Sequence, residues 1–281
     1  MINIRLFFLL LILSLSFSSF AKKSCVQEQL QKLRESSLVV SSGKLPQTEE
    51  EYRVIFNFSQ SKYLRKVDFK KMEETLEEII RNGPKNMSEK KLERLQSDRI
   101  LAQRVRGNYI LFSAENASPR AYHQFVRDLG YLNDAIIEGK SKVAREMAGK
   151  VLKHMRSGKH LPENSPFIPA KARSITQFAE KKFTEIEALL VKPMDIHAYH
   201  DIKKDIRNFK FLFGTLNKHS PHPTYEDLGR QASHITDVLG ERKDILFRDS
   251  SIDKDALVTI EPDMQTAIRK FFSDFRTANK K

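Results

Sequence analysis

The chain has 281 residues, of which 49 are Lys or Arg and 36 are Asp or Glu, so its formal net charge is +13. This excess favours a polyanionic partner: a nucleic acid, an anionic membrane surface or a phosphate polymer. Cys25 is the only cysteine, which excludes a disulfide within the chain and leaves the fold to be held by its core.

Residues 1–21 have the pattern of a secretory signal peptide. Arg5 forms a short basic region, residues 6–17 are apolar, and residues 19–21 are small ones that signal peptidase accepts, apart from Phe20. The apolar run is shorter than the roughly 20 residues that a membrane span needs. The residues before Cys25 do not resemble a lipobox. We therefore expect cleavage after Ala21 and a soluble periplasmic protein. An uncleaved N-terminal anchor is the alternative.

The rest of the chain predicts an all-α fold. Gly and Pro number 10 each, and no sustained alternation of apolar and polar residues indicates a strand. Apolar residues recur at helical spacing instead, and antiparallel helices with short connections form bundles. Asp68 has the position of an N-cap and Gly83-Pro84 that of a stop, while Gly139 and Gly158 mark expected breaks. Helical patterns occupy residues 27–40, 68–82, 88–114, 118–159, 174–191, 200–213, 225–249 and 264–281.

A boundary is expected at residues 160–173, which contain three prolines and form the longest irregular segment. The predicted order after the signal peptide is an N-terminal helical segment (22–87), a first helical half (88–159), this linker, and a second helical half (174–281).

The helix predicted at residues 200–213 gathers its basic residues on one side. At ~100° per residue, one arc carries the positive charge and the opposite arc is apolar. The basic arc contains His200, Lys203, Lys204, Arg207 and Lys210, and the apolar arc contains Ile202, Ile206, Phe209 and Phe213. An earlier segment, residues 99–112, also has Arg99 and Arg106 on one face.

A short repeat follows each of these basic helices. Leu-Gly-x-x-x-Asp occurs at residues 129–134 and again at 239–244, with the two glycines 110 residues apart. We interpret the chain as two similar helical halves. The glycines are expected where two helices pack closely.

The second half resembles the CHAD domain, the conserved histidine α-helical domain. The family's signature helix, His-x-apolar-basic-x-x-apolar-Arg-x-apolar-basic, is present as His200, Ile202, Lys203, Ile206, Arg207, Phe209 and Lys210. Its companion motif is present as Ile235, Asp237, Leu239, Gly240 and Asp244. In the first half, Arg99 and Arg106 fall on basic positions, but Gln96 stands at the histidine position. By motif, the resemblance covers residues 88–247.

This resemblance implies two helical bundles facing each other across a basic channel that binds inorganic polyphosphate, with no covalent chemistry. The export signal departs from the cytoplasmic location that is usual in the family. We therefore expect a non-enzymatic protein that binds polyphosphate or a similar polyanion. The candidate binding residues are His200, Lys203, Lys204, Arg207, Lys210, Arg99 and Arg106, and, on a further basic face, Lys142, Arg145, Lys153 and Arg156.

Other interpretations stay open. A basic strip is often only a solvated face, and this is the simpler interpretation of residues 142–156. The main rival function is a periplasmic scaffold or adaptor whose basic face binds a protein or an anionic membrane surface, and a nucleic acid is a weaker alternative to polyphosphate. His197 and His200 could share a metal, but no nearby residues complete a ligand set, so we expect no metal. No Gly-rich phosphate loop or Gly-x-Ser-x-Gly elbow indicates an enzyme or a cofactor.

Overall fold

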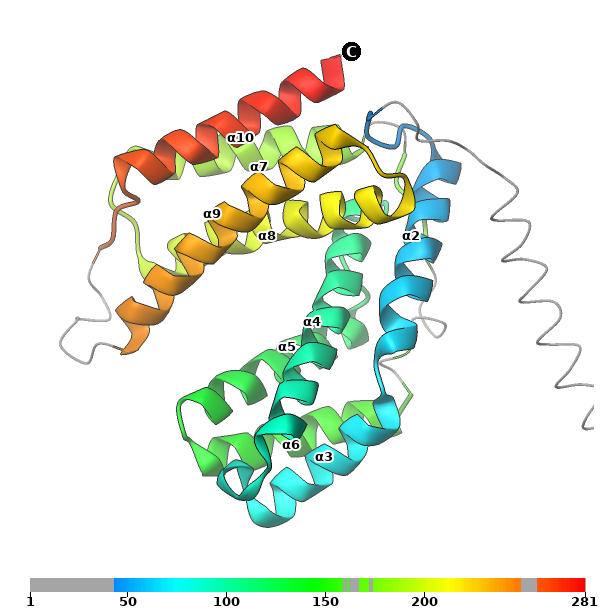
Figure 1. The fold of residues 1–281 in the computed structure, drawn as a ribbon, viewed down its shortest axis with the longest axis vertical. Coiled ribbons are helices and arrows are strands. Elements are labelled where there is room, and N and C mark those ends of the chain that lie inside the picture. Colours follow the sequence, from blue (N-terminus) through cyan, green and yellow to red (C-terminus); the bar gives the residue numbers. More distant parts are fainter. Residues whose placement is uncertain (1–42, 159–160, 162–166, 172–173, 249–256, 281) are drawn as a thin grey trace, which may run out of the picture. The chain divides into compact units, whose positions relative to one another are not determined.

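A computed structural model describes residues 43–158, 161, 167–171, 174–248 and 257–280 (Figure 1). The predicted signal peptide, its cleavage site, Cys25 and the helix expected at 27–40 lie outside these residues. The described part is helical and contains no strand, only two isolated bridges, Ser113 with Pro169 and Met194 with Val258. The predicted all-α class is thereby confirmed. All described residues belong to one compact unit, residues 40–281.

Among the described residues, five α-helices precede the Pro-containing segment. Their bounds are α2 (Glu49–Tyr63), α3 (Phe69–Asn82), α4 (Glu89–Phe112), α5 (Arg120–Ile137) and α6 (Ser141–Arg156). Asp68 is the predicted N-cap of α3, and its carboxylate accepts a hydrogen bond from the Lys71 backbone N–H at 3.1 Å. The predicted break between α5 and α6 falls at Gly139, whose φ of 68° is a conformation that glycine adopts without strain.

Four α-helices follow that segment in the part of the chain that the structure describes. They are α7 (Ser174–Leu190), α8 (Ile196–His219), α9 (Pro223–Arg248) and α10 (Pro262–Lys280). Helix α8 begins four residues before the start predicted for it, because Asp195 caps it by accepting a hydrogen bond from the Ala198 N–H at 2.7 Å. The predicted basic segment therefore lies well inside a 24-residue helix.

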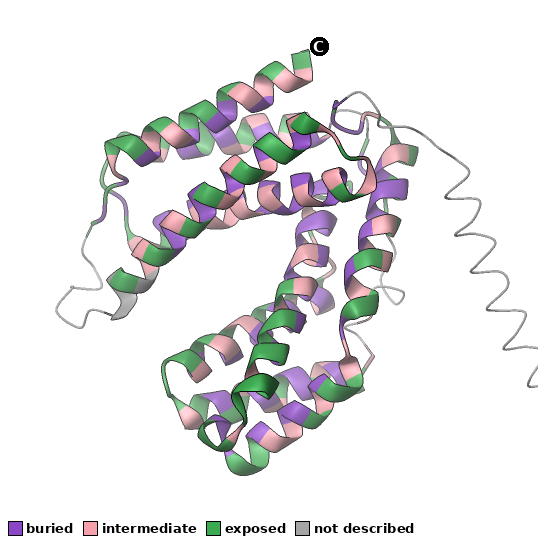
Figure 2. Ribbon diagram, in the orientation of Figure 1, coloured by how far each residue is buried: buried purple, intermediate pink, exposed green. Residues whose placement is uncertain are grey.

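Each group of helices packs in the same order. In the first, α3 packs against α6, α6 against α5, and α5 against α4, while α2 also covers α4. In the second, α7 packs against α10, α10 against α9, and α9 against α8. The helices bury one side and expose the other (Figure 2). Helix α3, which lies in the predicted N-terminal segment 22–87, thus packs within the first bundle.

The described part of the Pro-containing segment is held by the first group of helices. The Phe167 ring stacks on Phe56 with centroids 3.7 Å apart. The backbone N–H of Ala170 donates to the carbonyl of Phe112 at 2.7 Å, and that of Ala114 donates to the carbonyl of Ile168 at 3.0 Å. This part of the predicted linker therefore contributes to the first bundle as well as joining it to the second.

The two groups meet where α4 packs against α8. A Cβ on Gly107 would lie 3.0 Å from the Phe211 ring, so glycine allows the close approach. Beside it, the buried Asn108 amide donates to the hydroxyl of Ser59 at 2.6 Å and to that of Thr215 at 3.3 Å. This polar junction joins α2, α4 and α8.

No helix in the described part of the chain is long and apolar enough to cross a membrane.

Candidate anion-binding site

The apolar arc of α8 fixes where its basic arc points. Ile202, Ile206, Phe209 and Phe213 are each 1% exposed or less. Phe209 packs against the rings of Phe183, Phe271 and Phe275. The predicted basic residues of α8 are on the other side and are only partly exposed. Burial of one face therefore orients the other, as the sequence pattern predicts.

Helices α4 and α8 bring three of the predicted arginines together. Burial lowers the pKa of Arg207 to about 10, and repulsion from Arg106 and Arg99 acts in the same direction. Burial likewise lowers the pKa of Arg99 and that of Arg106. At neutral pH all three guanidinium groups keep their charge. The site therefore holds like charges from both bundles close enough to repel one another.

Few internal contacts compensate this charge. The Nε atoms of Arg99 and Arg207 are buried, and neither has a hydrogen-bond partner among the described residues. Asp134 attracts Arg99, whereas the charged groups that shift the pKa of Arg207 are Arg106 and Arg99. Buried donors of this kind are normally paired. An anionic ligand would supply the missing acceptors.

Two histidines lie in the same charged environment. Burial lowers the pKa of His200 to about 4, as do Lys243, Arg207 and Lys204, with only Asp201 opposing them. This is the histidine that the sequence predicted, and its ring is half-exposed.

The other histidine is His123 of α5, which sequence reasoning missed. Its pKa is lowered by partial desolvation and then by Arg106 of α4, Arg127 of α5 and Lys204 of α8. Lys204 therefore acts on both histidines, although these belong to different bundles. The signal could not be found in the motif, because His123 and Arg127 join the cluster only when α5 packs against α4. Gln96, at the expected histidine position, instead lines a small recess with Arg99, Leu129 and Asn133.

The repeated glycine has a different environment in each half. A Cβ on Gly240 would lie 2.8 Å from Nζ of Lys203, so this glycine makes room for the lysine of the signature helix. A Cβ on Gly130 would meet nothing within 4 Å. The expected close helix packing is therefore absent at Gly130, and at Gly240 the neighbour is a lysine side chain.

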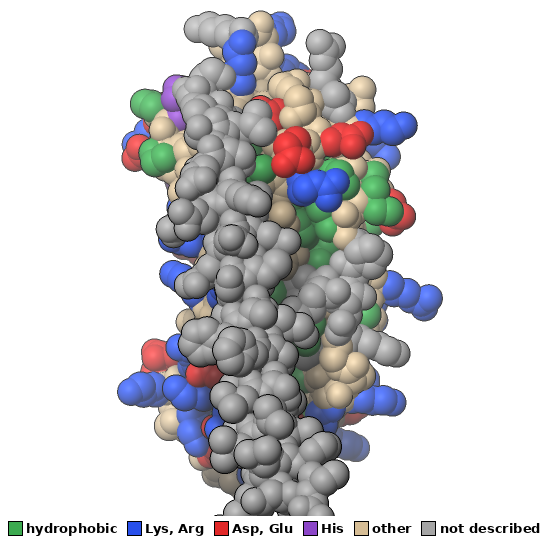
Figure 3. Space-filling view, turned by 90° about the vertical axis from the view of Figure 1, so that its right-hand side faces the viewer, with side chains coloured by type: hydrophobic (Ala, Val, Ile, Leu, Met, Phe, Trp, Pro, Cys, Tyr) green, Lys and Arg blue, Asp and Glu red, His purple; other side chains and the backbone are tan. Residues whose placement is uncertain are grey.

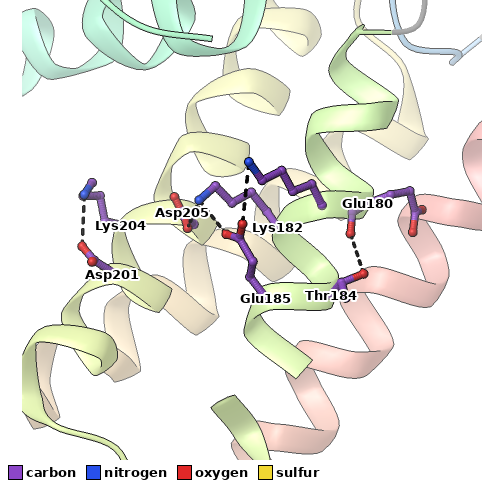
Figure 4. A network of polar contacts seen from close by, with 8 residues as sticks. Glu180, Lys182, Thr184, Glu185, Asp201, Lys204 and Asp205 are labelled. Atoms are coloured by element: carbon purple, nitrogen blue, oxygen red, sulfur yellow. Dashed lines mark hydrogen bonds and ion pairs between the residues drawn. The ribbon is translucent and has the colours of Figure 1, made fainter. Parts of the chain in front are cut away.

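Two of the predicted lysines on α8 have carboxylate partners. Nζ of Lys210 lies 2.9 Å from Asp237, the aspartate of the companion motif, and Nζ of Lys204 lies 3.0 Å from Asp201. Between α7 and α8, Lys182 contacts both Glu185 and Asp205, at 2.8 Å and 3.2 Å (Figure 4). The Lys204 and Lys210 pairs reach the surface, so they are weak in water and can exchange for a ligand anion, whereas Lys182 and Asp205 are half-buried.

Of the predicted basic face of α6, only Arg156 has ion-pair partners on α3. Arg156 contacts Glu73 at 3.0 Å and also contacts Glu77. The Arg145 guanidinium lies beside Gly83, while Lys142 and Lys153 are exposed. None of these four is among the charged groups that act on His123, His200 or Arg207. The structure therefore does not bring the α6 residues into the cluster of α4, α5 and α8.

Basic residues are not gathered everywhere on the surface. On the visible part of the face in Figure 3, Lys and Arg side chains lie beside Asp and Glu side chains. The described residues also contain no group of three or more His, Cys, Asp or Glu side chains that could hold a metal ion.

Comparison with protein-family models, curated proteins and solved structures found no match to this chain.

Proposed function

We propose that this protein binds inorganic polyphosphate, or a similar phosphate-rich polyanion, without catalysing a reaction. The observation that carries the proposal is the convergence of Arg99, Arg106 and Arg207 from two helices into a partly desolvated cluster. Like charges in a medium of reduced polarity repel one another strongly. A bound anion would attract all three guanidinium groups and so offset the repulsion between them. The arrangement therefore favours the liganded state.

The chemistry of the cluster suits a linear polymer of phosphates. A guanidinium group can bind two phosphate oxygens with its planar fork, whereas a lysine acts as a point charge. Arginines on α4 and lysines on α8 would contact successive phosphates and release their counterions, which makes binding sensitive to salt. Because the apolar arc of α8 is buried, the cations are held in place before the ligand arrives.

The packing order supports a CHAD-like architecture within this proposal. Helices α3 to α6 and helices α7 to α10 make the same succession of contacts, first with fourth, fourth with third, and third with second. The second helix of each set, α4 or α8, has 24 residues and carries the basic side chains. We interpret the two sets as equivalent halves. The signal-peptide pattern of residues 1–21 supports the periplasm as the proposed location.

The test is a titration of the chain from Lys22 with long-chain polyphosphate at two salt concentrations. The double variant Arg106→Gln and Arg207→Gln should bind at least about tenfold more weakly, with a salt dependence shallower by roughly one counterion per lost contact. The matched control is Lys142→Gln with Lys153→Gln, which removes two exposed charges from α6 and should leave affinity nearly unchanged.

Competition decides between the proposed ligand and its rivals. Polyphosphate should compete better than heparin or DNA at equal charge, and vesicles of anionic lipid should bind weakly. Equal affinities for all four would indicate a non-selective basic surface. If the double variant and the control bind polyphosphate equally, the cluster is only a solvated face and the proposal is wrong.

A further inference from the structure

A second group of cations lies where α2, α4 and α8 pack against one another (Figure 1). Tyr63, the last residue of α2, is 2% exposed, and its ring has a cation from each of the other two helices over it. Cζ of Arg104 on α4 lies 5.3 Å from the ring centroid, and Nζ of Lys218 on α8 lies 5.3 Å from the same point. The two cations can therefore be no further apart than twice that distance.

Buried aromatic rings hold Arg104 in position. Besides its contact with Tyr63, Cζ of Arg104 lies 5.7 Å from the ring centroid of Phe211, which is also buried. The face of an aromatic ring is negative and attracts a cation. Because both rings are packed inside the protein, the guanidinium is oriented before any ligand arrives.

Neither cation has an acidic partner. No carboxylate among the described residues lies within ion-pair distance of Arg104 or Lys218, and the buried Nε of Arg104 has no hydrogen-bond partner there. A buried donor of this kind is normally paired. The lack of acidic residues extends to the chain segments that form this corner, which contain no Asp or Glu: residues 60–66, 99–112 and 211–219. An oxyanion would supply the missing negative charge.

This pair of cations is separate from the arginine cluster of the proposed function. Arg104 and Arg106 are two positions apart, so they project about 200° apart around α4. On α8, Lys218 is roughly three turns, or about 16 Å, beyond Arg207. Helix α4 meets α8 at Phe211, which lies between those two residues. The two groups of cations therefore lie on different sides of the contact between α4 and α8.

We propose that Arg104 and Lys218 form a second anion-binding site, which takes a small phosphate-type anion such as pyrophosphate. This inference goes beyond the proposed function, because it uses neither the cluster nor the polymer of that function. The planar fork of Arg104 would bind two oxygens of one phosphate group, and Lys218 would bind the other group as a point charge. Two cations match a ligand of two phosphate groups, whereas a polymer needs a longer row of them.

The test is a calorimetric titration of the chain from Lys22 with pyrophosphate. The double variant Arg104→Gln and Lys218→Gln should bind pyrophosphate at least about tenfold more weakly, because it loses charge-assisted hydrogen bonds to both phosphate groups. The variant of the arginine cluster, Arg106→Gln with Arg207→Gln, should keep this binding. The control on α6 that removes two exposed lysines should bind pyrophosphate as the unsubstituted protein does.

A second pair of variants tests the role of the Tyr63 ring without removing a charge. Tyr63→Phe keeps the aromatic face and should bind pyrophosphate normally. Tyr63→Leu removes that face from under both cations, so its affinity should fall by about two- to fivefold, the effect of a lost cation–π contact. Circular dichroism at the titration temperature confirms that each variant is folded.

The outcomes separate this inference from the proposed function. If the unsubstituted protein does not bind pyrophosphate, or if Arg104→Gln with Lys218→Gln binds it as tightly as the α6 control, the second site is overturned. If the variant of the arginine cluster loses pyrophosphate instead, the anion occupies that cluster, and the proposed function stands without a second site. Titration with long-chain polyphosphate completes the test: Arg104→Gln with Lys218→Gln should keep its affinity for the polymer, and an equal loss for both ligands would contradict a separate site.

Discussion

Single residues in this protein are defined by what surrounds them more than by their type. Arg207 and Arg156 are both arginines at helical spacing in basic stretches. Arg207 is half-buried and is repelled by two other arginines, whereas Arg156 is exposed and contacts two glutamates of α3. The first would be stabilised by an anion. Arg156 already has two carboxylate partners, so replacing it should affect stability slightly and polyphosphate binding little.

Gly240 gives a residue-scale prediction. In Gly240→Ala the new Cβ would lie 2.8 Å from Nζ of Lys203, the far end of a flexible side chain. The lysine should move aside at small cost, because alanine also favours the helix by roughly 0.5–1 kcal/mol. The expected result is a nearly unchanged melting temperature with weaker polyphosphate binding.

The matched control for that change is Gly130→Ala, at the equivalent place in the repeated motif. Nothing lies within 4 Å of its Cβ, so this variant should be somewhat more stable and should bind normally. Thermal denaturation and the polyphosphate titration measure the two properties. A large loss of stability in Gly240→Ala, or normal binding by it, would show that the position of Lys203 does not matter to the site.

At the scale of elements, the two faces of α8 differ in burial and in charge. Its apolar face is part of an aromatic core with α7 and α10, and its basic face belongs to the cluster. A residue that is fully buried on this helix should therefore affect folding, and a residue on the other face should affect binding.

Phe209 tests this division. The side chain is fully buried among Phe183, Phe271 and Phe275. Phe209→Ala should reduce the free energy of unfolding by roughly 3–5 kcal/mol, because the cavity adds to the lost burial. The control Ile245→Ala, at a residue 64% exposed on α9, should change it by less than ~0.5 kcal/mol. Urea denaturation measures both. A loss below 1 kcal/mol for Phe209→Ala would mean that the aromatic core tolerates the cavity.

The sequence was sufficient for some elements and not for others, for physical reasons. The period of α8 predicted both of its faces because helical geometry is local. The cap of α3 at Asp68 and the break at Gly139 were also readable, since each depends on one residue type. The lowered pKa of His123, by contrast, depends in part on Arg106 and Lys204, which lie on other helices. The contacts of Arg156 with α3 depend equally on long-range packing, which no spacing within α6 reveals.

At the scale of the whole molecule, the cellular location of the protein can be tested. If residues 1–21 direct export, the protein isolated from its native cell should begin at Lys22 and be found in the soluble periplasmic fraction. Mass spectrometry of the native N-terminus measures this, with a cytoplasmic protein followed through the same fractionation as the control. An intact Met1 recovered with the membranes would contradict the export proposal and favour an N-terminal anchor.

The junction of α4 and α8 has one further consequence. The chain has a single cysteine, so no disulfide within it ties the two bundles together. A phosphate chain held by Arg106 on one helix and Arg207 on the other would itself be a cross-link, made of ionic contacts beside the packed Gly107. Ligand that binds only the folded chain raises its stability in proportion to RT ln(1 + [L]/Kd). The polymer would thus hold the two bundles together reversibly. Its length and concentration would set how far the free energy of unfolding rises and whether the two bundles unfold in one transition.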